Sequence, residues 1–356
     1  MVLAWPFKKR AKSFLGIDIG TAEIRIVELS RYGDQEKLEN YGSLSLAPFY
    51  SISPTIVKKG GLLFSSKRLA ELVASILAEA KMETKKACFS IPDFSTLFTT
   101  FTLPPMGEEE ISQAVKFEAR RHVPLPLSEV TLDWLITKGK PSSERKEELE
   151  ILLVVVPNRI IDQYNEIAEL CGLELKALEA EVFSLERALV KNQKGVFCLV
   201  DIGARSTTCS IIDNQTLRLS YSFDTAGNDL TERLAKTFGF DYEKAEVLKK
   251  NQGLLEGEKD LSATLKPLLS AMASEISRVV QNFYEREGKE VNTYIIAGSS
   301  ASLPGLKEYF AQYFKKEINI AFPFSGMLYP SLLERELKKI GPSFAIATGV
   351  ALKGLE

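Results

Sequence analysis

The sequence predicts an α/β protein built from two related lobes around a central cleft. Two stretches carry this prediction, residues 14–29 and residues 197–212, and each reads as a buried strand, Asp-Ile-Gly, a small polar turn and a second apolar strand. The two copies lie in different halves of a chain of 356 residues. Strands and helices also alternate along both halves, which is typical of a layered α/β fold.

The first part of the chain predicts a β-sheet covered by a helix. Strands are expected at residues 14–19, 24–29 and 38–46, where apolar side chains predominate. A loop rich in Ser, Pro and Gly follows at 48–61. Residues 66–81 place apolar side chains three and four positions apart, so we expect a helix there with one buried face.

A segment of different character begins near residue 87, with short strands bounded by prolines and a helix with an acidic first turn. Its expected elements are strands at 88–91 and 97–103, a helix at 106–121, and strands at 130–137 and 150–156. We therefore expect residues 87–157 to form a compact β-β-α-β-β insertion.

The rest of the chain returns to alternating strands and helices on both sides of the second Asp-Ile-Gly copy. A helix capped by Asn158 is the first of them. The expected helices are 158–171, 181–190, 229–238, 242–250, 262–286, one after the Gly/Ser turn at 297–305, and 343–352, and the expected strands are 173–178, 196–200, 207–212, 217–223, 291–297 and 318–321.

Composition excludes several classes of function. A net charge of −2 provides no basic field for nucleic acid. The single histidine and four widely separated cysteines argue against a Cys/His zinc site and a His-based catalytic triad, and favour reduced cysteines in a cytoplasmic protein. No apolar run reaches the roughly 20 residues of a spanning helix. The basic segment 1–12 is expected to be a flexible terminus, with contact between Trp5, Phe7 and an anionic membrane surface as the alternative.

The repeated turn has the chemistry of a phosphate site. Its glycine lets the backbone approach a ligand closely, and its backbone N–H groups can converge on an anion. Asp18 and Asp201 end the strands that enter the two turns. A carboxylate in this position can hold a hydrated Mg²⁺, which prefers carboxylate, phosphate and water oxygens. One such turn is ordinary turn chemistry, but two copies in the same context predict a shared phosphate-binding cleft.

With these motifs in this order, the sequence resembles the actin-like superfamily of ATP-binding folds. Within that superfamily it resembles the PilM family of type IV pilus systems, which is similar to the cell-division protein FtsA. The resemblance extends from about residue 13 to residue 355. It rests on these stretches in order: 16–21 with 27–30, Ile91-Pro92, Leu103-Pro104 and Val123-Pro124, 200–203, Gly227-Asn228 with 245–249, and Ala297-Gly298 with 303–306.

The resemblance implies a two-lobed actin-like fold, a duplicated ribonuclease H-like architecture, with the insertion as a small subdomain. Its implied divisions are a flexible basic terminus at 1–12, a first lobe of 13–86 with 158–194 and 330–356, the insertion at 87–157, a second lobe of 195–228 with 291–329, and a helical subdomain at 229–290.

The same resemblance implies ATP and Mg²⁺ as cofactors and at most a slow ATPase. Asp18 and Asp201 would hold Mg²⁺, and Glu181, with Asp201, would act on the attacking water, unless Glu181 is only an acid at a helix N-terminus. The implied nucleotide-binding residues are Gly20, Thr21, Gly203, Ala204, Arg205, Ser206, Gly227, Asn228, Glu246, Lys249, Gly298 and Ser299. For Glu246 and Lys249 the alternative is an ordinary surface ion pair.

The resemblance also implies a partner. In the PilM family a groove between the insertion and the first lobe receives an N-terminal peptide of PilN, an inner-membrane pilus protein, and pilus motor or platform components are further candidate partners. Four aromatic residues are candidates to line that groove, Phe94, Phe98, Phe101 and Phe117. The alternative is that they form the insertion's own core, and we expect at least two of them to do so. Membrane association would then come mainly through the partner, at the inner face of the inner membrane.

Three functions therefore compete. The first is a nucleotide-responsive cytoplasmic adaptor of the pilus machine, which the order of the motifs favours. The second is a small-molecule kinase of the same superfold, which needs an acceptor pocket with a general base, and no acceptor motif is evident. The third is an FtsA-like membrane filament, which normally uses a C-terminal amphipathic helix, whereas this sequence ends within or just after its last predicted core helix.

Overall fold

The computed structural model describes residues 12–47, 62, 64–142, 147–257 and 260–356. The loop predicted at 48–61 and all but the last residue of the basic segment 1–12 therefore lie outside the described residues. In the described part of the chain, no helix combines the length and the apolar character that crossing a membrane requires.

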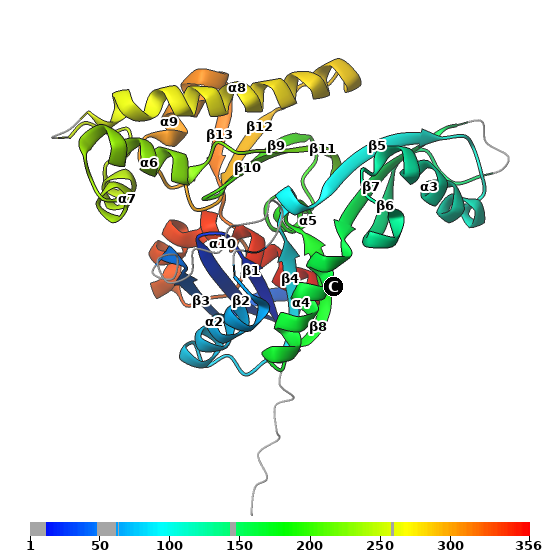
Figure 1. Ribbon diagram of the computed structural model, residues 1–356, viewed down its shortest axis with the longest axis horizontal. Coiled ribbons are helices and arrows are strands. Elements are labelled where there is room, and N and C mark those ends of the chain that lie inside the picture. Colours follow the sequence, from blue (N-terminus) through cyan, green and yellow to red (C-terminus); the bar gives the residue numbers. More distant parts are fainter. Residues whose placement is uncertain (1–11, 48–61, 63, 143–146, 258–259) are drawn as a thin grey trace, which may run out of the picture.

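The first lobe is a five-stranded sheet with helices packed against both of its faces (Figure 1). Its strand order is β3-β2-β1-β4-β8, in which β1, β2 and β3 are antiparallel neighbours and β4 and β8 continue in parallel. The strands are β1 (Ser13–Ile19), β2 (Glu23–Tyr32), β3 (Gln35–Ser45), β4 (Lys86–Ile91) and β8 (Glu174–Ala180). Helices α2 (Ser66–Glu79) and α4 (Asn158–Leu170) share one hydrophobic cluster with these strands.

The second lobe repeats that arrangement. Its strand order is β11-β10-β9-β12-β13, again three antiparallel strands followed by two parallel ones. The strands are β9 (Val196–Ile202), β10 (Thr207–Asp213), β11 (Thr216–Phe223), β12 (Thr293–Ala297) and β13 (Glu317–Ile320), and the helices are α6 (Gly227–Phe238), α7 (Tyr242–Asn251), α8 (Leu261–Glu287) and α9 (Leu306–Phe314). The repeated order confirms the two related lobes that the paired motifs predict.

Two helices, α5 (Glu181–Leu189) and α10 (Glu334–Leu355), join the lobes (Figure 1). Their apolar side chains share one cluster with residues of β4 from the first sheet and of β9 and β12 from the second. The prediction started the last helix at residue 343, but α10 begins nine residues earlier and runs through Pro342. Proline usually breaks a helix, but here burial of one helix face between the sheets outweighs the lost hydrogen bond.

The crossing of α5 and α10 depends on Gly349. A Cβ at this position would lie 1.9 Å from the carbonyl oxygen of Ser184, which is backbone and cannot move aside. We expect Gly349→Ala to lower the free energy of unfolding by about 3 kcal/mol, the upper end of overpacking effects. Chemical denaturation measures this loss. The control is Gly107→Ala, where the nearest atom lies 3.7 Å from the added Cβ. Equal stability of both variants would contradict the close helix contact.

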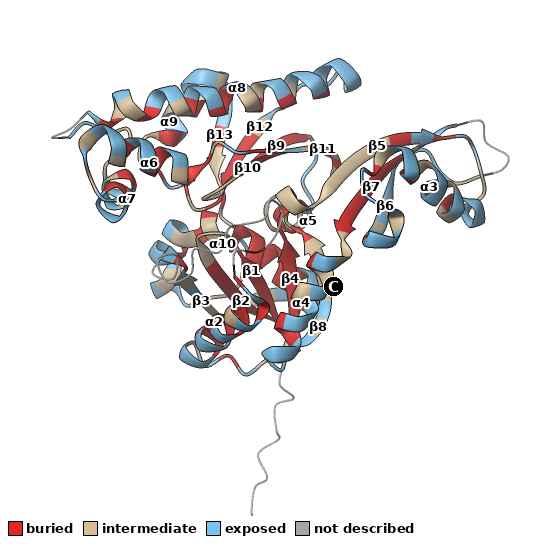
Figure 2. Cartoon of the chain, viewed as in Figure 1, coloured by how far each residue is buried: buried red, intermediate tan, exposed pale blue. Residues whose placement is uncertain are grey.

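The insertion is a three-stranded antiparallel sheet, in the order β5-β7-β6, covered by one helix. Its elements are β5 (Leu97–Leu103), α3 (Glu108–His122), β6 (Val130–Lys138) and β7 (Leu149–Pro157). It projects to one side of the two lobes (Figure 1). In Figure 2 buried residues follow the inner strands of the first sheet and parts of β5 and β7, whereas α3 is exposed along most of its length.

Two details of the predicted insertion are wrong. Strand β4, expected to open the insertion, pairs in parallel with β1 and β8 and belongs to the first lobe. Its six residues are apolar enough for a central strand as well as for a small subdomain, so local pattern could not place it. Asn158 does not cap α4, which has Pro157 at its N-cap. Its amide instead donates to the carbonyl of Ser128 at 3.0 Å.

Candidate functional site

An open cleft of about 570 Å³ lies where the two Asp-Ile-Gly turns face each other. It is lined by both turns, the first residues after β4, the start of α5 and the middle of α10. Among the predicted site residues the lining contains Asp18, Gly20, Thr21, Glu181, Asp201, Gly203, Ala204, Arg205, Ser206, Gly298 and Ser299. Chain segments far apart in sequence thus form one site, as the paired motifs predict.

The two turns are built alike. In the first, the N–H of Gly20 donates to the carbonyl of Glu23 at 3.1 Å, and in the second the N–H of Gly203 donates to the carbonyl of Ser206 at 3.0 Å. The second turn is also supported from α6, because the N–H of Gly227 donates to the carbonyl of Gly203 at 3.0 Å. The two lobes thus present turns with the same hydrogen-bond pattern to one cleft.

Two aspartates lie at the ends of the equivalent strands. Asp18 is buried and accepts a hydrogen bond from the hydroxyl of Ser90 at 2.9 Å. Oδ1 of Asp201 is also buried, but no described residue bonds to it. Burial, together with the charge of Asp18, raises the pKa of Asp201 to about 7, while Arg25 acts in the opposite direction. Among the described residues, the two carboxylates therefore have too little positive charge nearby to keep the pKa of Asp201 at its usual value.

Two further acids lie behind this pair, and one of them was not predicted. Glu181, the first residue of α5, accepts the backbone N–H of Asp93 at 3.0 Å, and Asp93 accepts the N–H of Val182 at 3.3 Å. Burial first, and then the charges of Asp93, Asp18 and Asp201, raise the pKa of Glu181 well above its usual range. Glu181 therefore lines the cleft and, through Asp93, contacts the start of the insertion.

The pKa of Asp93 gives a testable pH dependence. Burial, with a smaller contribution from the charge of Asp201, raises this pKa to about 8. An unfolded aspartate ionises near pH 4, so between about pH 4 and pH 8 the folded state binds more protons and stability falls as pH rises, by up to ~1.4 kcal/mol per pH unit. We expect Asp93→Asn, which mimics the protonated acid, to unfold at a higher temperature than the wild type at pH 8 and at a similar one at pH 4. Thermal unfolding without Mg²⁺ measures both, and a parallel pH profile for the two proteins would contradict the assignment.

The cleft also holds two arginines, which differ in whether their terminal guanidinium nitrogens already have partners. The terminal nitrogens of Arg25 already bond to Glu23 at 2.7 Å and to Asp18 at 3.4 Å. Arg205, in the second turn, has a buried terminal nitrogen to which no described residue bonds. Arg205 therefore has an unmatched donor in the cleft, as a site for phosphate requires.

The donor set fits a hydrated Mg²⁺. No three His, Cys, Asp or Glu side chains of the described residues are placed to bind one metal ion together. The two available carboxylates, Asp18 and Asp201, match an ion that keeps several waters and takes its other ligands from phosphate. The unpartnered Oδ1 of Asp201 is the group that such an ion would satisfy.

Gly298 closes the cleft from the second lobe. Its φ is +90°, and a Cβ there would lie 2.5 Å from both Oδ1 of Asp201 and the carbonyl oxygen of Ile202. Its N–H donates to the carbonyl of Pro342 at 2.9 Å, which ties this turn to α10. A side chain at this position would occupy the space beside the carboxylate of Asp201, so glycine is required here.

Four residues predicted for the nucleotide do not line the cleft: Gly227, Asn228, Glu246 and Lys249. Lys249 is buried, and its ammonium group bonds to the carbonyl of Gly227 at 2.9 Å, the hydroxyl of Thr231 at 2.8 Å and the carboxylate of Glu246 at 2.6 Å. The Glu246–Lys249 pair is therefore neither a cleft residue pair nor an exposed surface pair. It fastens α7 to the start of α6, behind the second turn.

The four phenylalanines predicted for the partner peptide lie in different environments. Phe94 lines the cleft, and Phe98 contacts Phe183 of α5 with ring centroids 6.3 Å apart. Phe101 is buried in the insertion's core, and Phe117 on α3 is 61% exposed. Phe98 and Phe101 are three residues apart on β5, so they point to opposite faces. The predicted common lining is thus wrong, and of the four only Phe101 belongs to the insertion's core cluster.

Comparisons with known proteins agree with this architecture. The chain is 20% identical over 350 residues to the cell division protein FtsA of Enterococcus faecalis, across 87% of this chain and 78% of that protein. The structure of a PilM–PilN type IV pilus biogenesis complex matches with a TM-score of 0.83 at 24% identity, covering 96% of this chain and 98% of that chain. MreB5 of Spiroplasma citri bound to AMPPNP matches with a TM-score of 0.56 at 13% identity, covering 97% of both chains.

These structural matches show that the fold is the two-lobed actin-like α/β fold. A family model adds the closer relationship, because the model described as type IV pilus assembly protein PilM matches residues 16–355. That match spans nearly the whole chain, both lobes and the insertion included. The chain therefore belongs to the PilM family of type IV pilus assembly proteins.

Proposed function

We propose that this protein is an ATP-binding adaptor in type IV pilus assembly, which binds Mg-ATP in the cleft and a membrane partner on the insertion. The observation that carries the nucleotide part is the pair of matched turns with unpartnered groups of both signs between them, Oδ1 of Asp201 and the buried nitrogen of Arg205. An anionic ligand with its divalent cation would satisfy both groups at once.

Each cleft residue then has a distinct role. Asp18 and Asp201 hold the hydrated cation, whose chemistry is to neutralise charge on the phosphates. Phosphate oxygens bind to the guanidinium of Arg205 and to backbone N–H groups of the turns at 20–21 and 203–206, other than those of Gly20 and Gly203, which donate within their own turns. Glu181 orients the attacking water. A kinase would also need a site for an acceptor substrate that carries a hydroxyl or a carboxylic acid. The arrangement described here needs no such site, so we propose nucleotide binding with at most slow hydrolysis.

The partner would be a PilN-like inner-membrane protein that contributes an extended N-terminal peptide. The solved relative is a complex of PilM with PilN. In this chain β6 is a terminal strand of the insertion sheet, and its Leu135 and Ile136 are 49% and 37% exposed. A peptide could pair with this strand edge before Thr137, whose carbonyl accepts from Arg218, and place apolar side chains beside these residues. The protein would then act on the cytoplasmic side of the inner membrane through its partner.

Calorimetry with the cytoplasmic N-terminal peptide of the PilN-like protein, with and without Mg-ATP, tests the proposal. We expect both ligands to bind and the peptide affinity to change with nucleotide. Peptide affinity that is indifferent to nucleotide would leave a docking protein with an uncoupled ATP site. Absence of peptide binding would overturn the adaptor assignment, as would efficient phosphate transfer to sugars or carboxylic acids.

A further inference from the structure

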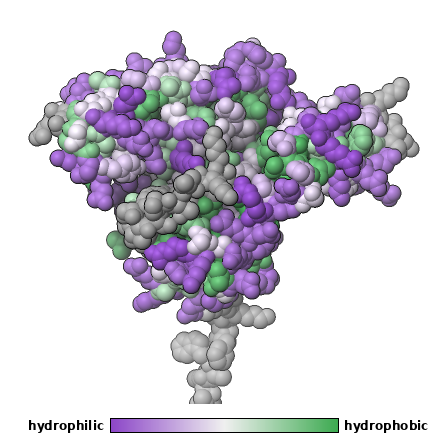
Figure 3. Space-filling model, viewed as in Figure 1, coloured by the Kyte–Doolittle hydropathy of each residue, from purple (hydrophilic) through white to green (hydrophobic). Residues whose placement is uncertain are grey.

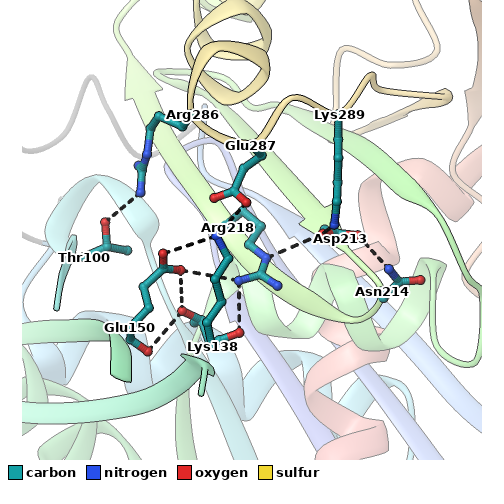
Figure 4. A network of polar contacts seen from close by, with 10 residues as sticks. Thr100, Lys138, Glu150, Asp213, Asn214, Arg218, Arg286, Glu287 and Lys289 are labelled. Atoms are coloured by element: carbon teal, nitrogen blue, oxygen red, sulfur yellow. Dashed lines mark hydrogen bonds and ion pairs between the residues drawn. The ribbon is translucent and has the colours of Figure 1, made fainter. Parts of the chain in front are cut away.

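The insertion is attached to both lobes, by different means. The chain joins it to the first lobe twice, through the short turn after β4 and at the junction of β7 with α4. A network of polar contacts joins it to the second lobe (Figure 4). The network contains Thr137, Lys138 and Glu150 of the insertion and Asp213, Arg218 and Glu287 of the second lobe, and we call it the polar bridge.

Arg218, on the edge strand β11, lies at the centre of the polar bridge. Its guanidinium donates to the carbonyl of Thr137 at 3.0 Å and lies 3.4 Å from the carboxylate of Glu150, both on the insertion. On its own lobe it lies 3.8 Å from the carboxylate of Asp213. The side chains of Arg218, Glu150 and Asp213 are 12%, 17% and 2% exposed, so solvent screens these contacts less than it screens a surface pair.

A second set of contacts runs beside the first. The ammonium group of Lys138 lies 2.7 Å from the carboxylate of Glu287 at the end of α8, and Arg286 donates to the hydroxyl of Thr100 on β5 at 3.3 Å. The insertion thus contributes residues of β5, β6 and β7 to the bridge and its neighbouring contacts. The second lobe contributes residues of β11 and α8 to the same contacts. Figure 4 shows Lys138 and Glu150 directed toward Arg218 and Glu287.

An apolar contact lies behind the polar one. Leu152 and Val154 of β7 belong to the same hydrophobic cluster as Phe197 and Leu217 of the second lobe. Figure 3 shows hydrophobic residues gathered on the insertion where β5 and β7 run, whereas much of its outer surface is hydrophilic. The insertion is therefore packed against the second lobe and not merely adjacent to it.

We propose that the polar bridge couples the nucleotide cleft to the partner-binding insertion, an inference that rests on the proposed function. A ligand held by turns on both lobes favours one relative position of the lobes. The insertion follows the first lobe through the chain and the second lobe through the bridge. A change in lobe position must therefore either move the insertion or break the bridge, and each alternative alters the partner's binding surface.

The polar bridge can be disrupted by substitution without altering the cleft, because none of its residues lines the cleft. Arg218→Met removes the central cation and keeps much of the apolar stem. The matched control is Arg278→Met on α8, whose exposed guanidinium pairs with Glu275 in its own helix and lies 4.8 Å from the ring centroid of Tyr221, both in the second lobe. Each protein is titrated with Mg-ATP in the presence and absence of saturating peptide, and the ratio of the two dissociation constants is the coupling factor.

In the wild type and in Arg278→Met we expect a coupling factor of about 5 or more, in the usual range for linked sites. In Arg218→Met it should fall to within about twofold of unity, while each ligand alone binds within about threefold of the wild type. Lys138→Met, at the exposed end of the bridge, should lower the factor by a smaller amount. This second variant provides the test if Arg218→Met does not fold, as judged by thermal unfolding.

The outcomes separate the two proposals. A wild type that binds neither ligand overturns the proposed function and this inference with it. A wild type that binds both with a coupling factor of unity overturns the inference and leaves two independent sites. A coupling factor that persists in both Arg218→Met and Lys138→Met also overturns the inference, and the adaptor function stands.

Discussion

Asp201→Ala is expected to weaken Mg-ATP binding by about 100-fold, or ~2.7 kcal/mol, while the protein stays folded. The carboxylate lies at the end of β9 between the two turns, and its Oδ1 is buried with no partner among the residues that the structure describes. Removing it therefore breaks no hydrogen bond of that atom. It also removes the repulsion from Asp18 that contributes to the pKa of Asp201 near 7. The apo variant should accordingly unfold at a higher temperature than the wild type at pH 8.

The measurement is calorimetric titration with ATP, carried out with Mg²⁺ and with a chelator. The loss should be large with Mg²⁺ and small without it, because the carboxylate acts through the cation. Asp133→Ala, which removes an exposed acid from β6, is the control and should bind as the wild type does. Mg-ATP affinity at the wild-type level in Asp201→Ala would refute the metal assignment.

Asp18→Ala separates binding from folding. It should lose Mg-ATP affinity to a similar degree, but Asp18 is also the partner of Ser90 and Arg25. Its removal leaves a buried hydroxyl and a buried guanidinium with fewer partners, which lowers stability. Burial also raises the pKa of Asp18, so removing this carboxylate relieves a buried charge as well. The two variants should thus bind alike, with Asp18→Ala the less stable of the two. Equal unfolding temperatures would mean that the carboxylates are equivalent supports of the fold.

The parts of this molecule that were predictable from sequence are those encoded locally. The Asp-Ile-Gly turns carry their own hydrogen-bond pattern, and the alternation of strands and helices carries the lobe order. Their duplication indicated one cleft, because two similar halves tend to present equivalent turns to a common centre. That argument accounts for the lining residues in the two turns, whereas Glu181, Gly298 and Ser299 were predicted from the family resemblance.

The parts that were missed depend on contacts between distant segments. Asp93 follows a strand that local pattern could not assign to a lobe, so nothing near it indicated that it would meet Glu181, 88 residues away. The Glu246–Lys249 pair has ordinary helical spacing, and only the packing of α7 on α6 buries it. Among the missed lining residues, Pro342 and Ser343 belong to a helix whose proline argued against its full length. The local signal for Asp93 is limited to its place directly after Ile91-Pro92, where a strand leaves the sheet, and this place does not identify Glu181 as its partner.

Arg205→Gln is expected to lower the affinity for Mg-ATP by about 10- to 100-fold, in line with the loss of one or two charge-assisted hydrogen bonds. Arg25 cannot replace it, because its terminal nitrogens are already engaged by Glu23 and Asp18. Arg205→Lys should recover part of the affinity, since an ammonium group supplies the charge without the paired donors. The affinity of Arg205→Gln should also fall less steeply with added salt.

A purely structural role for Arg205 would give a different pattern. Its buried nitrogen has no partner among the described residues, so replacing the guanidinium should leave the apo protein at least as stable as the wild type. Thermal unfolding of the apo and Mg-ATP-bound forms measures this directly: the apo midpoint should hold or rise, and the shift caused by nucleotide should shrink. A fall in apo stability with an unchanged nucleotide shift would show that Arg205 supports the turn and does not bind phosphate. If Arg205 is kept unpaired in order to bind ligand, then replacing it should raise the stability of the apo protein and lower its affinity for nucleotide.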